Sequence, residues 1–299
     1  MVRNRTIEGS GHLKKVIIDT DIGDDIDDAL ALALALSSPE LEVIAITTVY
    51  GRVDIRAKLA SRILEAYNRL DIPVAMGVRR PLFGEESTHI PNQAPVLEDK
   101  NFPNIVDKHA VDLIIEMLER EKSLTIVTLG PLTNIALALL KNRDAFKNSE
   151  LVIMGGCITR PVAEYNIKTD PEAASIVFSS GLPMTLVGLD VTLKCVMTNE
   201  MLELVNKSPK PQVKLLKKFI GLWMRIYKRN PILHDPLTVA VSFNEEIVEK
   251  ARKHVVVELH GKYTRGFTVT LPKEEPNANV CIGVNSQQFL ELYESRVLT

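Results

Sequence analysis

The sequence predicts an α/β fold in which a doubly wound, mostly parallel central sheet is flanked by helices. Short apolar segments, rich in β-branched residues, alternate along the chain with longer segments of helical character. Most of the short segments are apolar on both faces and are bounded by Gly, Pro or Asp, which is typical of strands buried in a parallel sheet. Strands that alternate with helices require right-handed crossovers, and therefore helices on both faces of one sheet.

The first two-thirds of the chain can be divided into elements from these patterns. The expected strands are Lys15–Asp19, Glu42–Val49, Val74–Met76, Leu124–Leu129, Glu150–Met154 and Met184–Gly188. The expected helices are Asp27–Ser37, Asp54–Leu70, His109–Arg120, Pro131–Lys141 and Asp170–Ser180. One segment, Ala29 to Leu34, alternates Ala and Leu with a period of two, which also fits a strand. We interpret it as helix, because Ala and Leu favour helices and Asp27 and Asp28 suit a helix N-terminus.

The last third of the chain is less regular. Its expected elements are helices at Lys210–Arg229 and from His234 to about Phe243, strand-like runs at Val255–Leu259 and Gly266–Leu271, and a closing helix from Ser286. The long helix is basic and amphipathic. Residues 1–14 are expected to be a mobile N-terminal tail, which leaves residues 15–299 as a single domain.

Composition excludes several classes of protein. Lys+Arg number 36 and Asp+Glu 38, which gives a formal net charge of −2, so nucleic acid is not an expected partner. No apolar run approaches the roughly 20 residues of a membrane span, and no apolar stretch follows the basic start as in a secretory signal. Three widely spaced cysteines suggest neither a disulfide framework nor a Cys-based zinc site. We therefore expect a cytoplasmic protein.

An acidic segment follows the first strand. Residues 19–28 contain six aspartates, at the point where an apolar strand ends and a helix begins. Asp27 and Asp28 could cap that helix, but capping uses one or two carboxylates and leaves the others to repel each other. A purely oxygen donor set favours a hard cation, Ca²⁺ or Mg²⁺. The carboxyl edge of such a sheet is also where ligands bind.

Further motifs follow at the ends of the later elements. They are Ile46-Thr47-Thr48-Val49-Tyr50-Gly51, Gly130-Pro131-Leu132-Thr133-Asn134, Met154-Gly155-Gly156, Ala163-Glu164-Tyr165-Asn166, Asp170-Pro171-Glu172-Ala173-Ala174, Gly188-Leu189-Asp190 and His234-Asp235-Pro236. Together with Asp19-Thr20-Asp21-Ile22-Gly23 and Asp27-Asp28-Ala29, they resemble in order the nucleoside hydrolases of the inosine-uridine-preferring superfamily. The resemblance runs from about residue 15 to the C-terminus.

The resemblance implies a Rossmann-like nucleoside hydrolase fold and an enzyme that hydrolyses the N-glycosidic bond of ribonucleosides to free base and ribose. It implies one bound Ca²⁺, with Mg²⁺ as the weaker candidate, and a metal-activated water that attacks the anomeric carbon. It also implies a small-molecule ribonucleoside substrate, a role in purine or pyrimidine salvage, and a homodimer or homotetramer.

Roles in metal binding follow from the resemblance residue by residue. Asp21 matches the residue that binds the metal and takes the proton of the water. Asp28, the backbone carbonyl of Leu129 and Asp235 match the other metal ligands. Asp27 matches a carboxylate that binds a ribose hydroxyl.

Roles in substrate binding follow in the same way, and each has a structural alternative. Glu164 and Asn166 match residues that hydrogen-bond the ribose hydroxyls, although they could simply belong to a polar loop. Met154 matches a residue that packs near the sugar, or it is a core methionine. His234 matches the candidate acid for the leaving base, whereas a lone histidine is more often structural.

The chain has two residues more than the common family motif between Gly23 and the aspartate pair. Counting from Gly23 selects Asp25 for the ribose role, and counting from the helix selects Asp27 and Asp28. We follow the helix because it fixes the direction of the side chains.

Other departures bear on the substrate. Arg52 stands where the family usually has Asn, and the loop from Met154 to Glu164 is short, so that Thr159 and Arg160 are candidates to replace a missing 5′-hydroxyl contact. If Arg52 and Arg160 both face the site, they suit a ribosyl substrate that carries a phosphate or carboxylate.

Two further sets of residues have open interpretations. His89 lies in the Gly84–Leu97 segment, where the family's second histidine and glycine are absent. Trp223 and Tyr227 share one helix face, either to stack on the leaving base or to anchor the helix to the core.

Two other functions compete with hydrolysis of nucleosides. Asp19-x-Asp21 after an apolar strand resembles the start of a Mg²⁺-dependent haloacid-dehalogenase-type phosphatase, although Gly23 departs from that motif. The chain could also be a non-catalytic nucleoside- or ribose-binding protein.

Overall fold

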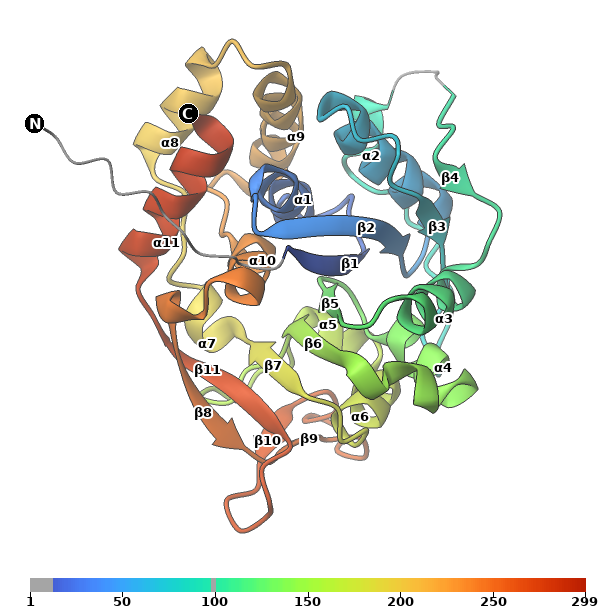
Figure 1. Cartoon of the computed structure of the whole chain (residues 1–299). Coiled ribbons are helices and arrows are strands. Elements are labelled where there is room, and N and C mark those ends of the chain that lie inside the picture. Colours follow the sequence, from blue (N-terminus) through green and yellow to red (C-terminus); the bar gives the residue numbers. More distant parts are fainter. Residues whose placement is uncertain (1–12, 98–100) are drawn as a thin grey trace, which may run out of the picture.

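A parallel sheet crosses the centre of the computed structural model, which describes residues 13–97 and 101–299 (Figure 1). Its strands are β1 (Lys14–Thr20), β2 (Leu41–Thr48), β3 (Val74–Met76), β4 (Ile105–Val106), β5 (Leu124–Thr128), β6 (Ser149–Met154), β7 (Met184–Val187), β8 (Val248–Lys253) and β11 (Ala278–Val284). Within the described residues the strand order is β4-β3-β2-β1-β5-β6-β7-β11-β8. All neighbours are parallel except β11 and β8. The expected mostly parallel sheet is therefore confirmed.

Helices cover both faces of this sheet. They are α1 (Asp27–Ser37), α2 (Val53–Ala66), α3 (Ala110–Arg120), α4 (Thr133–Lys141), α5 (Tyr165–Thr169), α6 (Pro171–Phe178), α7 (Leu189–Thr192), α8 (Asn199–Lys207), α9 (Pro211–Tyr227), α10 (His234–Phe243) and α11 (Ser286–Tyr293). Figure 1 shows α1, α2 and α9 on one side of the sheet and α3, α4 and α6 on the other. A small hairpin of β9 (Val255–Val257) and β10 (Thr268–Thr270) packs against α6.

Two hydrophobic cores lie on opposite faces of the sheet. Along β1, Val16 and Ile18 belong to the core that contains α1, α9 and α10, while Ile17 belongs to the core that contains α3, α4 and α6. Successive side chains of a strand point to opposite faces, so a strand that is apolar at every position is buried on both sides. The doubly wound architecture follows directly from this pattern.

The strand order reverses direction at β1. The chain first moves outward from β1 through β2, β3 and β4, and then returns to the other side of β1 to form β5, β6 and β7. The connections after β1 and β5 therefore diverge from each other and leave a crevice at the carboxyl ends of these strands, where ligands bind in folds of this kind. The acidic segment begins at this crevice.

The Ala/Leu segment after the acidic turn forms helix α1, as expected. The helix is buried from Asp27 to Ala35, and it packs against α2, α9 and α10 as well as β2. A helix with neighbours on every side needs no polar face, which explains why its sequence lacks a helical hydrophobic period. The period of two in this segment therefore carries no information about a strand.

Most expected elements occur within a few residues of their predicted bounds. The structure adds β4, β8, β11, α5, α7 and α8, which were not among the elements expected from the sequence. Strand β8 is an edge strand of sequence VEKARK. Its charged residues replace the run of apolar residues by which the other strands were recognised. Strand β1 begins at Lys14, one residue before the predicted start of the domain, and residues 1–12 of the expected mobile tail lie outside the described residues.

The cysteines and the apolar helices are arranged as in a protein without disulfide bonds or a helical membrane span in its described residues. Cys157, Cys195 and Cys281 are all free and buried, as expected of a chain without a disulfide framework. Within the described part of the chain, no helix has the length and apolarity that a membrane crossing requires.

The burial of α1 leads to a first prediction. Leu32 is fully buried in the centre of this helix, so Leu32→Ala should lower the free energy of unfolding by about 2–5 kcal/mol through lost burial and a residual cavity. Denaturant unfolding measures this change. The matched substitution Leu140→Ala, at a side chain of α4 that is 64% exposed, should cost under about 0.5 kcal/mol. Equal effects of the two substitutions would contradict the placement of α1.

Candidate active site

A cavity of about 460 Å³ opens at the crevice where the strand order reverses. That volume is within the usual range for a small-molecule site. Every residue assigned to the site from the sequence lines it: Asp21, Asp27, Asp28, Leu129, Met154, Glu164, Asn166, His234 and Asp235. They come from the ends of β1, β5 and β6 and from the N-termini of α1, α5 and α10. The fold thus brings the predicted residues into one pocket.

Three buried aspartates form a polar cluster in this pocket. One carboxylate oxygen from each of Asp27, Asp28 and Asp235 lies within 4.8 Å of the others. Asp27 and Asp28 open α1 and Asp235 is in the first turn of α10, and these two helices pack against each other. The positive ends of both helix dipoles therefore face the cluster, which favours negative charge there.

The carboxylates of this cluster are costly to ionise together. Burial, together with repulsion among the neighbouring carboxylates, raises the pKa of Asp27, Asp28 and Asp235 well above the usual value. No salt bridge among the described residues involves any of the three. A donor set made of carboxylate oxygens matches the preference of Ca²⁺ and Mg²⁺ and not that of softer metals. The residues present therefore fit a hard divalent cation.

Asp21 lies at the rim of the cluster, directly after β1. Burial raises its pKa to about 6, although the nearby Arg56 charge opposes the shift. Its backbone is fixed by Arg56 of α2, whose guanidinium donates to the carbonyls of Asp21, Ile22 and Tyr50. A half-buried carboxylate with a pKa close to neutrality, on a fixed backbone, has the properties of a general base.

The carbonyl of Leu129 faces the same pocket from the end of β5. Asn166 donates from Nδ2 to this carbonyl at 2.8 Å and, more weakly, to the carbonyl of Met154 at 3.3 Å. A carbonyl oxygen has two lone pairs, so the bond from Asn166 leaves one for another partner. Asn166 therefore links the two strand ends on which the floor of the pocket is built.

Glu164 has a structural task in addition to its place in the pocket. Its buried carboxylate accepts from the backbone N–H groups of Asn166 at 2.9 Å and of Ile167 and Gly156 at 3.1 Å each. It therefore caps α5 and holds the turn that follows β6. Burial nevertheless raises the pKa of Glu164, even though all three bonds favour the charged form.

His234 lies at the start of α10, next to the aspartate cluster. Its Nδ1 lies 2.7 Å from Thr192 Oγ1, which orients the ring. Burial and the positive charge of Arg229 lower the pKa of His234 to about 4, so its imidazole is neutral at pH 7. A neutral imidazole still has one N–H that it can donate, and the assignment of His234 as the acid for the leaving group remains a prediction.

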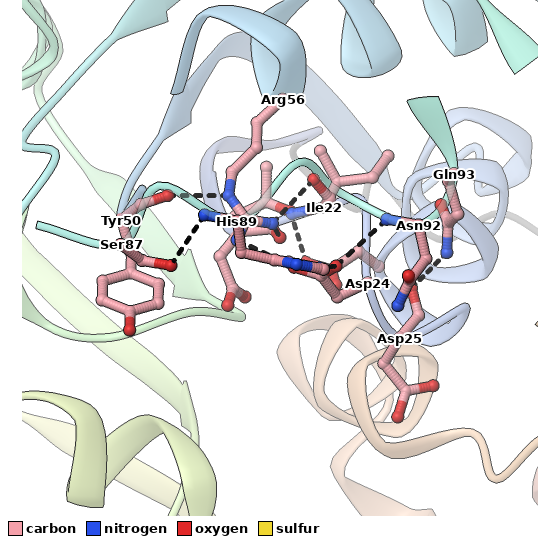
Figure 2. A network of polar contacts seen from close by, with 12 residues as sticks. Ile22, Asp24, Asp25, Tyr50, Arg56, Ser87, His89, Asn92 and Gln93 are labelled. Atoms are coloured by element: carbon pink, nitrogen blue, oxygen red, sulfur yellow. Dashed lines mark hydrogen bonds and ion pairs between the residues drawn. The ribbon is translucent and has the colours of Figure 1, made fainter. Parts of the chain in front are cut away.

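Asp24 and Asp25 of the acidic turn contact a segment that is distant in the sequence. Asp24 contacts His89 Nε2 and accepts from the backbone N–H of Asn92 (Figure 2). Both His89 and Asn92 line the pocket. Asp25 also lines the pocket, and burial raises its pKa. The cluster with Asp28 and Asp235 includes Asp27 and not Asp25, which agrees with numbering the motif from the helix.

Trp223 and Tyr227 of α9 were expected either to stack on the leaving base or to anchor the helix to the core, and the structure places the two residues differently. Trp223 is buried and stacks on Tyr227, with 4.8 Å between the ring centroids. Tyr227 is 42% exposed and lines the pocket, whereas Trp223 does not. Trp223 thus anchors α9 to the core and presents Tyr227 at the mouth of the pocket.

Neither arginine considered for an anionic substrate lines the pocket. Arg52 makes a two-pronged ion pair with Asp54, at 2.9 and 2.7 Å, and Arg160 is an exposed loop residue. Thr159 donates to Asp190, which fixes the short loop after β6. The geometry therefore gives no support to a phosphate or carboxylate on the ribosyl group.

Asp19, the first aspartate of the segment, lies beneath the pocket and does not line it. It is fully buried, it accepts from Thr47 and Asn134 at 2.5 and 2.7 Å, and its Oδ2 has no partner. Burial, opposed by these two bonds, raises its pKa to about 7. A carboxylate in this position cannot reach a substrate as the nucleophile of a phosphatase would.

The sequence interpretation missed several residues of the site. Arg56 lies on the buried face of α2, beside Val53 and Ala57. A charged residue among the apolar positions of an amphipathic helix is a signal in the sequence that could have identified it. Tyr165, Ala163 and Leu189 also line the pocket. These three lie next to residues that were singled out, but their types alone carry no signal.

The fold and the pocket define a doubly wound α/β protein with a pocket of clustered carboxylates at the reversal of the sheet. A family model described as inosine-uridine preferring nucleoside hydrolase matches residues 16–291, so the chain belongs to this family.

Individual relatives agree with the family assignment. The pyrimidine-specific ribonucleoside hydrolase RihA of Photobacterium profundum is 38% identical over 95% of this chain and 98% of that protein. The RihA of Salmonella typhimurium is also 38% identical, over 94% and 97%. Among solved structures, the plant nucleoside hydrolase PpNRh1 superposes with a TM-score of 0.84 at 32% identity, covering 96% of this chain and 99% of that one. A purine-preferring ribonucleoside hydrolase from Gardnerella vaginalis gives 0.86 at 31%, covering 95% and 98%.

These findings confirm the family and the reaction expected from the sequence. The protein is an enzyme that hydrolyses the N-glycosidic bond of ribonucleosides. The phosphatase and the non-catalytic binding protein receive no support from the comparisons.

The structural task of Glu164 can be tested directly. Glu164→Gln leaves one carboxamide oxygen for three backbone N–H groups and turns an NH₂ toward at least one of them. We expect a loss of about 1–3 kcal/mol in the free energy of unfolding. Denaturant titration of this variant and of Glu203→Gln, an exposed residue of α8, provides the comparison. If both variants unfold at the wild-type midpoint, the capping role of Glu164 is wrong.

Proposed function

We propose that the acidic pocket carries out this hydrolysis on the ribosyl part of the substrate with Asp21 as the general base. The observation that carries the proposal is that Asp21, the three clustered aspartates, Glu164 and Asn166 line one cavity. Carboxylates around the sugar stabilise the positive charge that develops on a ribosyl group as its bond to the base breaks.

Each residue has a defined part in this proposal. Asp21 takes a proton from the water whose oxygen attacks the anomeric carbon. Asp27, Glu164 and Asn166 hold the ribose hydroxyls. The electrons of the broken C–N bond pass to the nitrogen of the base, which is then protonated, and His234 is the candidate donor.

We propose that Asp21, Asp28, Asp235 and the carbonyl of Leu129 hold a Ca²⁺ ion, with Mg²⁺ as the weaker candidate. The buried and mutually repelling carboxylates support this assignment, because ionised groups in such a cluster are costly without a counter-charge. When bound, the ion would lower the pKa of a water and help to orient the ribose hydroxyls.

The remaining aspects concern the setting of the enzyme. We propose that it acts in the cytoplasm, in salvage of bases from ribonucleosides, as a homodimer or homotetramer. The three free cysteines are consistent with a reducing compartment. The names of the relatives cover both pyrimidine-specific and purine-preferring enzymes, so uridine and inosine are both needed as test substrates.

The role of Asp21 can be tested by substitution. Asp21→Ala should reduce kcat/KM for uridine and inosine by about 10³-fold, because the variant lacks the group that accepts the proton of the water. A reducing-sugar assay for released ribose measures this change. Asp112→Ala, which removes an exposed carboxylate of α3 paired with Lys141, should retain wild-type turnover. Near-normal activity of Asp21→Ala would contradict the proposed base.

The metal site can be tested without any substrate. At a Ca²⁺ concentration about 100 times its dissociation constant, the metal-free protein should gain about 2.7 kcal/mol in the free energy of unfolding. Calorimetric titration and denaturant unfolding, before and after chelation, measure binding and stabilisation. Asp235→Asn should weaken Ca²⁺ binding, while Asp112→Asn should leave it unchanged. Absence of Ca²⁺ and Mg²⁺ uptake by the wild-type protein would refute the site.

A further inference from the structure

One wall of the pocket comes from the segment Ser87–Gln93, which is exposed at Thr88–Ile90 and buried at Pro91 and Gln93. Residues Ser87–Gln93 lie between β3 and α3, and most side chains from Phe83 to Ile90 are exposed. His89 and Asn92 of this segment nevertheless line the pocket. Something must therefore hold them in place.

The carboxylate of Asp24 makes two of the polar contacts that fix this segment. Its Oδ1 lies 2.9 Å from His89 Nε2 and accepts from the backbone N–H of Asn92 at 3.1 Å. Its Oδ2 accepts from Arg56 Nη2 at 3.1 Å. Figure 2 shows these three groups converging on one side chain.

The backbone next to Asp24 adds further contacts with the same segment. The Gly23 carbonyl accepts from Gln93 N at 2.8 Å, and the Asp25 carbonyl accepts from the Gln93 side chain. Gly23 has φ of +137°, and a Cβ built on it would lie 2.6 Å from Pro91 Cβ. The turn at Gly23–Asp25 and the segment are thus in direct contact, in a space that only glycine permits.

Asp24 also joins the segment to the catalytic turn. Arg56 is 4% exposed, and the guanidinium that meets Asp24 also donates to the carbonyls of Asp21 and Ile22. The side chain of Asp24 is 28% exposed and that of His89 is 55% exposed. The ion pair of Asp24 with Arg56 is therefore largely buried, whereas the contact of Asp24 with His89 is exposed to solvent.

We propose that Asp24 is a positioning residue that holds the Ser87–Gln93 segment, and with it His89 and Asn92, against the pocket before the substrate arrives. Asp24 lies between Gly23 and Asp27, in the part of the acidic turn that is two residues longer than the common family motif. A wall formed in advance lowers the cost of ordering it when the substrate binds. The effect of Asp24 is then on substrate binding and not on bond cleavage. The inference rests on the proposed function only for the choice of substrate.

Hydrogen exchange and steady-state kinetics of the full-length protein test this proposal together. In Asp24→Ala, the amides of Asn92 and Gln93 should exchange about tenfold faster than in the wild type, while the global unfolding midpoint changes little. KM for uridine should rise about tenfold, with kcat within about twofold of the wild type. Asp24→Asn keeps an acceptor oxygen for Asn92 and should show smaller changes in both quantities.

Asp112→Ala is the matched control, because it removes a carboxylate from an exposed ion pair with Lys141 on α3. It should change neither the exchange of residues 87–93 nor KM. If Asp24→Ala does not fold, Asp24→Asn decides the question with the same two measurements.

The outcomes separate this proposal from the proposed function. Unchanged exchange at Asn92 and Gln93, or a loss of kcat at constant KM, would overturn the positioning role. If the wild-type protein did not hydrolyse uridine or inosine, the proposed function would fail, and the exchange measurement alone would still test the anchor.

Discussion

Mutual repulsion among buried carboxylates is the constraint on which the rest of the site depends. Asp27, Asp28 and Asp235 meet at the N-termini of two packed helices, where both helix dipoles favour negative charge but do not neutralise it. The surrounding groups are arranged around this cluster: Thr20 donates to Asp28 at 2.5 Å, and the backbone of Asp235 donates to Asp27 at 3.4 Å. Such a cluster needs a counter-charge or protons to offset the repulsion, which is the basis for the proposed cation site.

The sheet topology explains why residues far apart in sequence meet there. Strand β1 carries β2 on one side and β5 on the other, so the turns after β1 and β5 diverge and expose the edge between them. Leu129 and Met154 reach that edge as the residues at the ends of β5 and β6, and Asp235 reaches it because α10 packs on α1. Glu164 and Asn166 complete the pocket while fixing the short turn after β6. Glu164 and Asn166 therefore line the pocket and also hold its backbone in place.

Local patterns in the sequence predicted most of the fold and site, while contacts between distant segments escaped them. The helices Asp27–Ser37 and His234–Phe243 were predicted to within a residue, because their acidic first turns and strong helix formers are local signals. Strand β8 was missed because its charges belong to an exposed edge. Arg56 and the contacts of Asp24 were missed because they depend on where α2 and residues 87–93 lie, and no local pattern specifies this. The family resemblance supplied the roles of individual residues. Spacing alone did not decide whether Asp25 or Asp27 has the role of binding a ribose hydroxyl.

The separation of Asp27 and Asp235 by 208 positions has a consequence for how this enzyme is made. Closing so long a loop carries an entropic cost that only tertiary packing can offset, so α10 must dock on α1 before the aspartates meet. An emerging chain on the ribosome, or an amino-terminal fragment, contains β1 and its acidic turn but lacks Asp235, so the cluster of three aspartates cannot form in it. The cluster of three aspartates therefore forms only when the carboxyl-terminal third of the chain has packed against the rest of the fold.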